Sequence, residues 1–330
     1  MAEAVALGDG ARGTSAPNPN VGCVIVRDGA IVGRGATQAG GRPHAEAVAL
    51  AEAGEAAAGA HVYTSLEPCA HRSQRGPACT DLLIAARPDR VIVALQDPDP
   101  RTNGAGIDRL RQAGIRVDIG EGAAAAAASM EGFLSRIERG RPFVTLKLAL
   151  SIDGKIALPS GESRWITGVE ARRHVHEERA RADMILVGRG TFNADGPQLD
   201  VRLPGLEHRS PRRALLTRGE PVEGWAHLSS PEGIFSLHDV NDLLVEGGSG
   251  AASAFLARDL VDRMLIYRAP IIIGEGKSAL GWVGLSDLAA AHGRWDLRAT
   301  RSLGMDRLEV YERVRPAPDH ADAIHDGAKG

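Results

Sequence analysis

One histidine and two cysteines in the first third of the chain have the side-chain types and the order that bind zinc. His44 comes first, Cys69 follows directly after a proline, and Cys79 comes ten positions later. One imidazole and two thiolates supply three ligands of a tetrahedral zinc ion and leave the fourth position for water. Because structural zinc sites have four protein ligands, this pattern predicts a catalytic metal site.

A glutamate beside the histidine could act on that water. Zinc lowers the pKa of a bound water to about 7, and Glu46 lies two residues after His44. In the first turn of a helix its carboxylate can reach the water without binding the metal. His-x-Glu, then Pro-Cys and a second Cys, is the arrangement of zinc deaminases, in which the glutamate carries protons.

Two other interpretations of these residues compete with the catalytic one. The first is a buried histidine beside two core cysteines. The second is a structural zinc site with His71 as the fourth ligand. The remaining cysteine, Cys23, stands inside an apolar run and is expected to pack in the core.

The spacing of the cysteines narrows the class of substrate. Nine residues, 70–78, separate Cys69 from Cys79, whereas the usual deaminase spacing is two residues. The longer loop would give the substrate site a different wall from that of deaminases with the usual spacing. This argues against deaminases that edit nucleic acids or act on free nucleosides. The formal charge of −3 and an aromatic content of 4% also give no reason to expect a nucleic-acid partner.

The same composition bears on the setting of the protein. No apolar run approaches the roughly 18–20 residues needed to cross a bilayer, so no membrane partner is expected. The first twenty residues contain no basic segment followed by an apolar one, as a secretory signal would. Three cysteines cannot form a disulfide framework. We therefore expect a reducing, cytoplasmic setting.

The elements that must position these residues alternate between strand and helix in the first 140 residues. Strands are predicted over 21–26, 30–32, 61–66 and 90–95, and helices from His44 to Ala53, after Cys79, over 106–114 and over 123–137. The turn Asp28-Gly29 joins the first two strands as a hairpin. This order predicts a layered α/β domain with a largely covered sheet.

A second α/β domain is expected after Arg139-Gly140-Arg141-Pro142, where glycine and proline interrupt the pattern. Strands are predicted over 143–150, 184–187, 243–245 and 263–267, and helices over 172–182 and 251–260. The domains would cover residues 1–140 and 141–316, and the small, polar residues 317–330 are predicted to form a flexible tail.

A glycine-rich turn in the second half is a candidate phosphate site. Val245-Glu246-Gly247-Gly248-Ser249-Gly250 stands between a predicted strand and a predicted helix, where backbone N–H groups can approach a phosphate. It does not match the spaced glycines of the Rossmann fingerprint. Gly276-Lys277-Ser278 lacks the earlier glycine of a P-loop, because Ile271 occupies that position. A Rossmann or nucleotide-triphosphatase interpretation is therefore poor.

Motifs along nearly the whole chain resemble those of the bifunctional deaminase–reductase family of riboflavin biosynthesis. In the first half they are PNPNVGCVIV (17–26), PHAEA (43–47), LEPCAH (66–71) and QDPDP (96–100). In the second half they are LKLA (146–149), SIDGK (151–155), GESRWIT (161–167) and VEGG (245–248). The resemblance implies an α/β fold in which a cytidine-deaminase-like α/β/α domain precedes a dihydrofolate-reductase-like α/β domain.

The resemblance also implies two consecutive reactions on one small-molecule phosphoribosylaminopyrimidine. The first domain would bind Zn²⁺ and hydrolytically remove an amino group from 2,5-diamino-6-(5-phosphoribosylamino)pyrimidin-4(3H)-one. The second would use NADPH to reduce the ribosyl group to ribityl. A homo-oligomer is expected.

Carried over residue by residue, the resemblance assigns the deaminase site. His44, Cys69 and Cys79 match the zinc ligands and Glu46 the proton shuttle. Asn18 matches a substrate-contacting asparagine on the first strand, and Arg75 a basic residue that meets the substrate phosphate, as a guanidinium can do with two hydrogen bonds. A solvated loop charge is the alternative for Arg75, whose loop is one residue longer than the common family form.

For the reductase, the resemblance assigns two groups and one lysine. The NADPH site would contain the Leu150 backbone, Trp165, Thr191, Asp195, Gly248, Ser249, Gly250, Ala251, Ala252, Ser253 and Ala254. The substrate site would contain Ser163, Arg179, Leu199, Arg202 and Glu246. Lys147, one of four lysines, matches a lysine of the reductase site. Core packing is the alternative for Trp165, and an exposed helix face for Arg179.

Two departures from the family keep a second function open. Asp195-Gly196-Pro197 stands where the family commonly has Asp-Asp-Pro, and residues 203–241 are short for the strands and helix usually found there. The alternative is a deaminase alone, with the second domain as a scaffold for dimerisation or binding. A nucleic-acid-editing deaminase is disfavoured by the acidic charge, and a non-catalytic nucleotide-binding module by the presence of Glu46.

Overall fold

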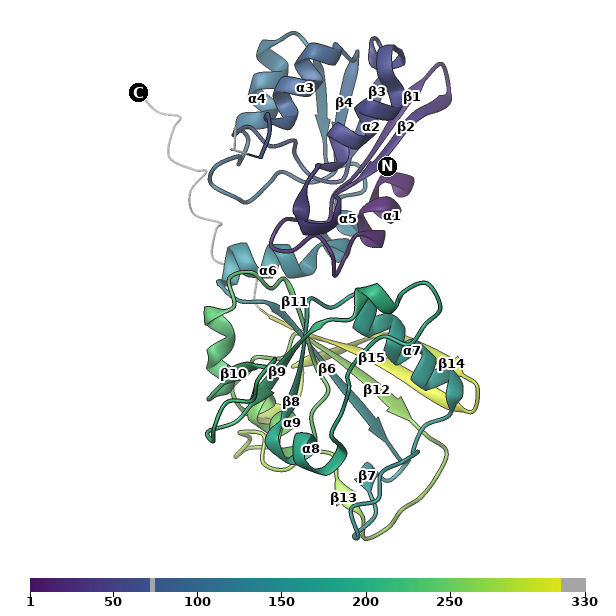
Figure 1. Cartoon of the computed structure of the whole chain (residues 1–330), viewed down its shortest axis with the longest axis vertical. Helices are drawn as coiled ribbons and strands as arrows, with labels where there is room; N and C mark the ends of the chain where they lie inside the picture. The colour runs from purple at the N-terminus through teal and green to yellow at the C-terminus, as the bar shows by residue number, and fades with distance from the viewer. Residues whose placement is uncertain (72–74, 316–330) are drawn as a thin grey trace.

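The chain forms two α/β bodies, one from each half of the sequence (Figure 1). The computed structural model describes residues 1–71 and 75–315. The predicted flexible tail 317–330 lies outside the described residues. Among those that are described, no helix is both long and apolar enough to cross a membrane.

The N-terminal body is built on a five-stranded sheet with the order β2-β1-β3-β4-β5. Its strands are β1 (Gly22–Arg27), β2 (Ala30–Ala36), β3 (His61–Thr64), β4 (Arg90–Val93) and β5 (Arg116–Ile119). Strand β1 pairs antiparallel with β2 and β3, and β3, β4 and β5 are parallel to one another. The predicted strands are therefore present, and β5 is one that the sequence pattern did not show.

The helices of this body are α1 (Ala2–Gly10), α2 (Ala45–Ala53), α3 (Cys79–Ala86), α4 (Ala105–Gln112), α5 (Ala123–Ser129) and α6 (Glu131–Arg139), with the 3-10 turns η1 (Ala39–Gly41) and η2 (Gly54–Ala57). The helix predicted over 123–137 is divided at Met130, whose backbone leaves the helical region and whose side chain is buried. This change of direction separates α5 from α6, the helix that leads to the second sheet (Figure 1).

Two glycines let the helices lie close against the hairpin β1–β2. A Cβ atom at Gly22 would lie 1.8 Å from the Ala4 carbonyl oxygen of α1, and one at Gly35 would lie 2.1 Å from the Ala45 carbonyl oxygen of α2. Any larger residue would push the helices away. The close approach at Gly35 fixes the first turn of α2, which begins directly after His44.

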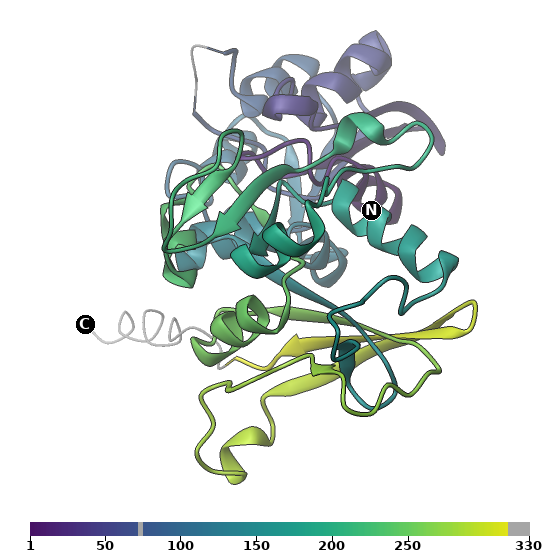
Figure 2. The ribbon, with the colours of Figure 1, turned by 60° about the horizontal axis from the view of Figure 1, so that its bottom comes forward.

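The C-terminal body is built on an eight-stranded sheet with the order β10-β9-β8-β11-β6-β12-β15-β14. Its strands are β6 (Phe143–Leu150), β8 (Met184–Gly188), β9 (Arg212–Leu216), β10 (Ala226–Leu228), β11 (Asp242–Val245), β12 (Arg263–Arg268), β14 (Trp295–Leu303) and β15 (Asp306–Arg313). The first six are parallel, and the hairpin β14–β15 adds antiparallel strands at one edge (Figure 2).

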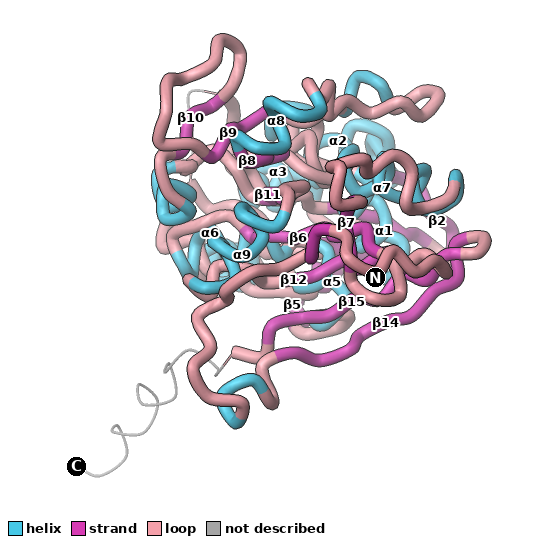
Figure 3. Tube along the Cα trace, turned by 90° about the horizontal axis from the view of Figure 1, so that it is seen from below, coloured by secondary structure: helices cyan, strands magenta, loops and turns pink. Residues whose placement is uncertain are grey.

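The other elements of this body are the helices α7 (Val169–Ala180), α8 (Arg189–Asp195) and α9 (Ser249–Ala257), the 3-10 turns η3 (Glu207–Arg209), η4 (Pro231–Ser236) and η5 (Ala289–Ala291), and a small sheet of β7 (Lys155–Ala157) and β13 (Lys277–Ser278). Viewed from below, α8 and β7 lie near the ends of the parallel strands (Figure 3). Open parallel sheets bind ligands beyond the carboxyl ends of their strands.

The short stretch 203–241 still supplies strands to the sheet. It contains β9, β10 and the 3-10 turn η4. Strands β9 and β10 form one edge of the sheet beyond β8, and the second body has its own buried core. Strands β14 and β15 were not predicted; β14 is mostly exposed, and its apolar residues alternate with polar ones only over residues 295–300.

Candidate functional site

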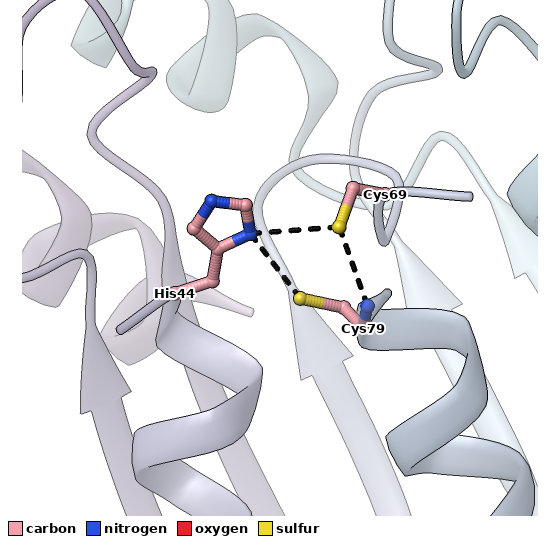
Figure 4. Close-up of side chains that lie close together, drawn as sticks. All are labelled: His44, Cys69 and Cys79. Carbon is pink, nitrogen blue, oxygen red and sulfur yellow. Dashed lines mark hydrogen bonds between the residues drawn. The ribbon is translucent and has the colours of Figure 1, made fainter. Parts of the chain in front are cut away.

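The three predicted zinc ligands come together in the N-terminal body. His44 caps the start of α2, Cys79 is the first residue of α3, and Cys69 lies in the loop after β3 (Figure 4). The His44 Nδ1 atom lies 3.3 Å from the Cys79 Sγ atom and 3.6 Å from the Cys69 Sγ atom. All three ligand atoms lie within 4.8 Å of one another. One nitrogen and two sulfur donors at this spacing fit a zinc ion.

The pKa values of the two thiols are shifted in opposite directions. The hydrogen bond from the Cys79 thiol lowers the pKa of Cys69 to about 4, against the effect of burial. The same contact, together with burial, raises the pKa of Cys79. The Cys79 backbone N–H also donates to the Cys69 Sγ atom, at 3.3 Å. A divalent cation between these sulfur atoms would stabilise both as thiolates.

Glu46 is placed beside this cluster and not in it. It lies in the first turn of α2 and is only 3% exposed. Burial raises the pKa of its carboxyl group, which also interacts with the Cys79 thiol. In the part of the chain that the structure describes, the metal-binding group consists of His44, Cys69 and Cys79. His71, the fourth ligand of the structural-zinc alternative, is not among them.

A buried glutamate that the sequence analysis did not assign holds the Cys69 loop. The Glu67 carboxylate accepts hydrogen bonds of 2.8 to 3.1 Å from four backbone N–H groups, those of Asp97, Gly104, Gly106 and Ile107. It thereby ties the Pro68–Cys69 segment to the start of α4. The sequence contains one sign of this role: Glu67 is a charged residue directly before Pro68-Cys69, in a segment whose other residues are buried.

Asn18 and Arg75 meet at the same 3-10 turn. The Asn18 Nδ2 group donates to the Gly41 carbonyl oxygen at 2.7 Å, and the Arg75 guanidinium to the Gly40 carbonyl oxygen at 2.7 Å. Gly41 precedes His44 by three residues, so both side chains contact the turn that leads to this metal ligand. The expectation that Asn18 lies on the first strand is wrong: it lies in the loop before β1, which starts at Gly22.

The C-terminal body contains a large cavity of about 1140 Å³ at the carboxyl side of the parallel sheet. Thirteen of the predicted reductase residues line it: Lys147, Ser163, Trp165, Thr191, Asp195, Arg179, Leu199, Arg202, Glu246, Gly248, Ser249, Gly250 and Ala251. Residues from five separate segments, distant in sequence, therefore share one cavity.

Four predicted cofactor residues do not line this cavity. Leu150 is buried at the end of β6, where its carbonyl oxygen accepts a hydrogen bond from the Ala269 N–H. Ala252, Ser253 and Ala254 lie further along α9, and the helix turns them away from the cavity. Ser253 instead accepts a hydrogen bond from the Gly281 N–H at 2.8 Å. Only the first turn of α9 faces the cavity.

A triad of charges forms one wall of the cavity. The Arg179 guanidinium binds both oxygens of the Glu246 carboxylate, at 2.6 and 3.0 Å, and the Lys147 Nζ atom lies 3.6 Å from that carboxylate. Burial alone would raise the pKa of Glu246, but the two cations outweigh it and hold the pKa below its usual value. The carboxylate stays ionised and fixes both cations at the wall.

The alternatives for Trp165 and Arg179 are wrong in this structure. Trp165 is 66% exposed, so it is not a core residue, and the Arg172 guanidinium lies 4.6 Å from its ring centre. Arg179 is largely buried by its pair with Glu246. Gly196, which replaces a family aspartate, has a left-handed backbone and ends α8 directly after Asp195.

Several cavity residues were missed by the sequence analysis. Arg172 and His176 line the cavity from α7, and Arg189 and Lys277 from other segments. Burial, then the charges of Arg179 and Arg202, lower the pKa of His176. The spacing of 172, 176 and 179 on one helix face was the available signal. Lys277 belongs to the Gly276-Lys277-Ser278 segment, which the P-loop comparison set aside, and nothing local in the sequence marks Arg189.

Comparison with known proteins identifies both halves. Residues 1–95 match the cytidine and deoxycytidylate deaminase zinc-binding region, and residues 142–228 and 234–307 match the RibD C-terminal domain. The riboflavin biosynthesis protein RibD of Escherichia coli is 38% identical, over 93% of this chain and 96% of the relative. That of Aquifex aeolicus is 37% identical, over 95% and 97%.

Solved structures agree with these matches. RibD of Acinetobacter baumannii (form 1) superposes with a TM-score of 0.87 at 34% identity, over 96% of this chain and 98% of that one. A deaminase/reductase from Thermotoga maritima gives a TM-score of 0.85 at 30% identity, over 95% and 97%.

The fold and the two sites thus define a two-domain protein with a zinc-binding domain of the cytidine deaminase type and a reductase domain. The predicted fold class, cytidine-deaminase-like and then dihydrofolate-reductase-like α/β, is confirmed. The chain belongs to the RibD family of bifunctional riboflavin biosynthesis proteins.

Proposed function

We propose that this protein deaminates 2,5-diamino-6-(5-phosphoribosylamino)pyrimidin-4(3H)-one with zinc and then reduces the ribosyl group of the product to ribityl with NADPH. The Thermotoga maritima relative is described as a diaminohydroxyphosphoribosylaminopyrimidine deaminase/5-amino-6-(5-phosphoribosylamino)uracil reductase. The observation that carries the proposal is the presence of two intact sites in one chain: the His44–Cys69–Cys79 cluster beside Glu46, and the charged cavity around Glu246. The deaminase domain would cover residues 1–140 and the reductase domain 141–316.

For deamination, His44, Cys69 and Cys79 would hold the zinc ion. Zinc, when bound, lowers the pKa of a water molecule so that it can add to the ring at neutral pH. Glu46 takes a proton from the water as its oxygen bonds to the ring carbon. Glu46 then delivers that proton to the amino group, the C–N bond breaks, and ammonia leaves. Its buried position supports this role, because a raised pKa suits a group that must both accept and donate a proton near neutral pH.

Asn18 and Arg75 would bind the same substrate. Both side chains border the 3-10 turn η1 beside the cluster, where an amide can contact the pyrimidinone and a guanidinium the phosphate. This arrangement supports Asn18 as the group that orients the ring and Arg75 as the phosphate contact.

For reduction, the cavity would hold NADPH and the deaminated product together. NADPH, when bound, supplies the hydride for the sugar carbon. Lys147, fixed by Glu246, offers an N–H donor to the sugar oxygen that gains a proton, and Arg179 and Arg202 supply positive charge for the phosphate. Trp165, Thr191, Asp195 and the first turn of α9 would contact the cofactor. Ser163 and Leu199 would complete the substrate side.

We further propose a cytoplasmic setting and a homo-oligomer. The three cysteines are free, as a reducing compartment requires. Large apolar side chains exposed on the reductase domain, Ile272, Trp282 and Leu288, supply surface for subunit contact. Light scattering on the purified protein measures the oligomeric state directly.

One assay tests both reactions. Zinc-loaded protein is mixed with the diaminopyrimidinone phosphate and NADPH, and ammonia release and NADPH absorbance are followed together. Release of ammonia followed by oxidation of NADPH is the expected result. Ammonia without NADPH oxidation would favour the deaminase-only alternative, and no ammonia from the zinc-loaded protein would overturn the substrate assignment.

A further inference from the structure

The reductase domain reaches into the loop that holds Asn18. Asn241, directly before β11, donates from its Nδ2 group to the Asn18 backbone carbonyl oxygen, at 3.1 Å. The Asn241 Oδ1 atom accepts a hydrogen bond of 2.8 Å from the Arg136 Nε–H. Arg136 also donates to the Pro17 carbonyl oxygen at 2.6 Å. Two successive carbonyl groups of the Asn18 loop, those of Pro17 and Asn18, are therefore bound by Arg136 and Asn241, and Asn241 itself is only 3% exposed.

The bridge is fixed at its reductase end. The Asn241 backbone N–H donates to the Asp183 carboxylate at 2.8 Å, and its carbonyl oxygen accepts from the Phe143 N–H at 2.8 Å. Both partners belong to the second sheet or lie at its edge, since Phe143 begins β6 and Asp183 precedes β8. The Asn241 backbone is thus hydrogen-bonded to the second sheet and its edge, while the Asn241 side chain is hydrogen-bonded to the Asn18 loop.

The bridge is connected to the metal cluster through Asn18 itself. The Asn18 side chain donates to the Gly41 carbonyl oxygen, and Gly41 lies three residues before His44. A Cβ atom at Gly41 would lie 2.1 Å from the Asn18 Nδ2 atom, so the two residues are in close contact. A shift of the Asn18 backbone would therefore displace the side chain at the approach to the cluster.

Ion pairs between the two domains are formed by residues other than Asn241. Arg12 pairs with Asp242 at 2.5 Å, and Arg181 binds both oxygens of Asp9 at 2.6 and 2.8 Å. The Arg181–Asp9 pair involves α1 and not the connection 11–21 that contains Asn18, whereas Arg12 lies near the start of that connection, six residues before Asn18. The amide of Asn241 is neutral and contributes two directional hydrogen bonds in place of an ion pair. Directional hydrogen bonds suit a group that fixes the position of the Asn18 backbone.

We propose that Asn241 of the reductase domain is a positioning residue for the deaminase: by holding the Asn18 backbone, it sets the Asn18 side chain for substrate. The inference rests on the proposed role of Asn18 as a substrate contact. The deaminase substrate site is then completed by the second domain, and not by residues 1–140 alone.

The test is the Asn241→Ser variant in the full chain, with KM and kcat for ammonia release measured separately. Asn241→Ser removes the hydrogen bond to the Asn18 carbonyl oxygen and also the one that Arg136 donates to the amide oxygen. Loss of the first, a neutral hydrogen bond that holds the Asn18 backbone directly, corresponds to a change of about threefold to tenfold. We expect KM to rise by that factor with kcat, zinc content and the rate of NADPH oxidation on the deaminated product unchanged. Arg181→Gln is the matched control: it breaks a domain contact away from the Asn18 loop and should leave KM unchanged.

A double-mutant cycle separates positioning from a general structural role. If Asn241 acts through the Asn18 side chain, Asn241→Ser should raise KM no further in the Asn18→Ala background. An additive rise in the double variant would overturn the inference. So would an unchanged KM in Asn241→Ser while Asn18→Ala raises it, a result that leaves the proposed function standing.

Two remaining outcomes are also decisive. If Asn18→Ala leaves KM unchanged, the proposed role of Asn18 fails and the positioning role of Asn241 falls with it. If Asn241→Ser loses zinc and both activities, Arg136→Gln removes the same bridge from the deaminase side. A rise confined to the KM of deamination supports the inference in that variant, and an unchanged KM overturns it.

Discussion

The two sites of this protein are built in opposite ways. The deaminase site is small: three ligand atoms lie within 4.8 Å of one another, and two of the three residues that carry them begin or precede helices. The reductase site is a cavity of about 1140 Å³ lined from separate segments, with a single tight charge triad at one wall. A compact site concentrates its function in a few side chains, whereas a wide one distributes it over many contacts.

This contrast has a physical origin in what each site must hold. A metal ion and one water need a few donors at fixed distances, which the chain itself supplies. The dinucleotide and phosphorylated sugar proposed for the second site would need a large surface with many separate contacts. Single substitutions should therefore abolish deamination but only weaken reduction, and the following variants probe that difference in order of decreasing effect.

Removal of a zinc ligand should have the largest effect. Cys69→Ser replaces a soft thiolate donor by a hydroxyl, so zinc content should fall from about one ion per chain to near zero and ammonia release should stop. NADPH oxidation on the deaminated product should continue. Metal analysis and the two assays check this. Cys23→Ala, in the core of β1, is the control and should retain zinc; loss of reduction in Cys69→Ser would contradict the separation of the sites.

The Glu46→Gln variant should keep zinc and lose proton transfer. General acid–base groups contribute about 10²- to 10⁴-fold to the rate, so kcat for ammonia release should drop by that factor with metal content unchanged. Glu52→Gln, on the same helix but exposed, should behave as the unmodified protein. Deamination that survives in Glu46→Gln would remove Glu46 from the mechanism.

At the reductase cavity, Lys147→Ala should slow NADPH oxidation and spare ammonia release. The change removes one cation from the Glu246 carboxylate but leaves the Arg179 pair in place, so we expect a loss on the order of 10²-fold and not complete inactivation. Stopped-flow absorbance on the deaminated product measures it. Lys155→Ala, outside the cavity, serves as the control. An equal loss of both activities would mean that Lys147 is structural.

The smallest effect is expected at Trp165. Because its ring is already 66% exposed, Trp165→Ala should leave the melting temperature unchanged and raise the KM for NADPH by about threefold to tenfold, the value of one lost aromatic contact. Trp282→Ala removes a ring that is 75% exposed and not part of the cavity, and should leave the KM for NADPH unchanged. A fall in melting temperature for Trp165→Ala alone would restore the core-packing interpretation.

The same contrast explains how far the sequence could predict the sites. His44, Glu46, Cys69 and Cys79 could be found because each lies beside a local signal: a helix start, a proline, or a short motif. The reductase residues could be placed only by resemblance, and the resemblance assigned more residues to the cofactor site than line the cavity. Ala252, Ser253 and Ala254 follow the glycine-rich turn in sequence, but the rotation of α9 by about 100° per residue carries them out of the cavity.

Parts of the fold gave only a weak local signal, or none. Strand β14 alternates apolar and polar residues over 295–300, but Arg301 interrupts the alternation, which is then too short to identify the whole strand. The division of α5 from α6 at Met130 depends on burial against the rest of the domain, which no periodicity records. The bridge from Asn241 to Asn18 joins residues 223 positions apart, and such contacts follow from the docking of the two domains alone.

The distribution of the cysteines has a consequence for cells under oxidative or heavy-metal stress. All three, Cys23, Cys69 and Cys79, lie in the deaminase domain, and the remainder of the chain from residue 80 onward contains none. Thiol-directed poisons such as peroxide or mercury would therefore disable the cluster proposed to bind zinc, and would find no thiol to attack in the cavity proposed to bind NADPH. In the proposed order of reactions, such damage halts the sequence at its first, hydrolytic step, before any reducing equivalent has been consumed.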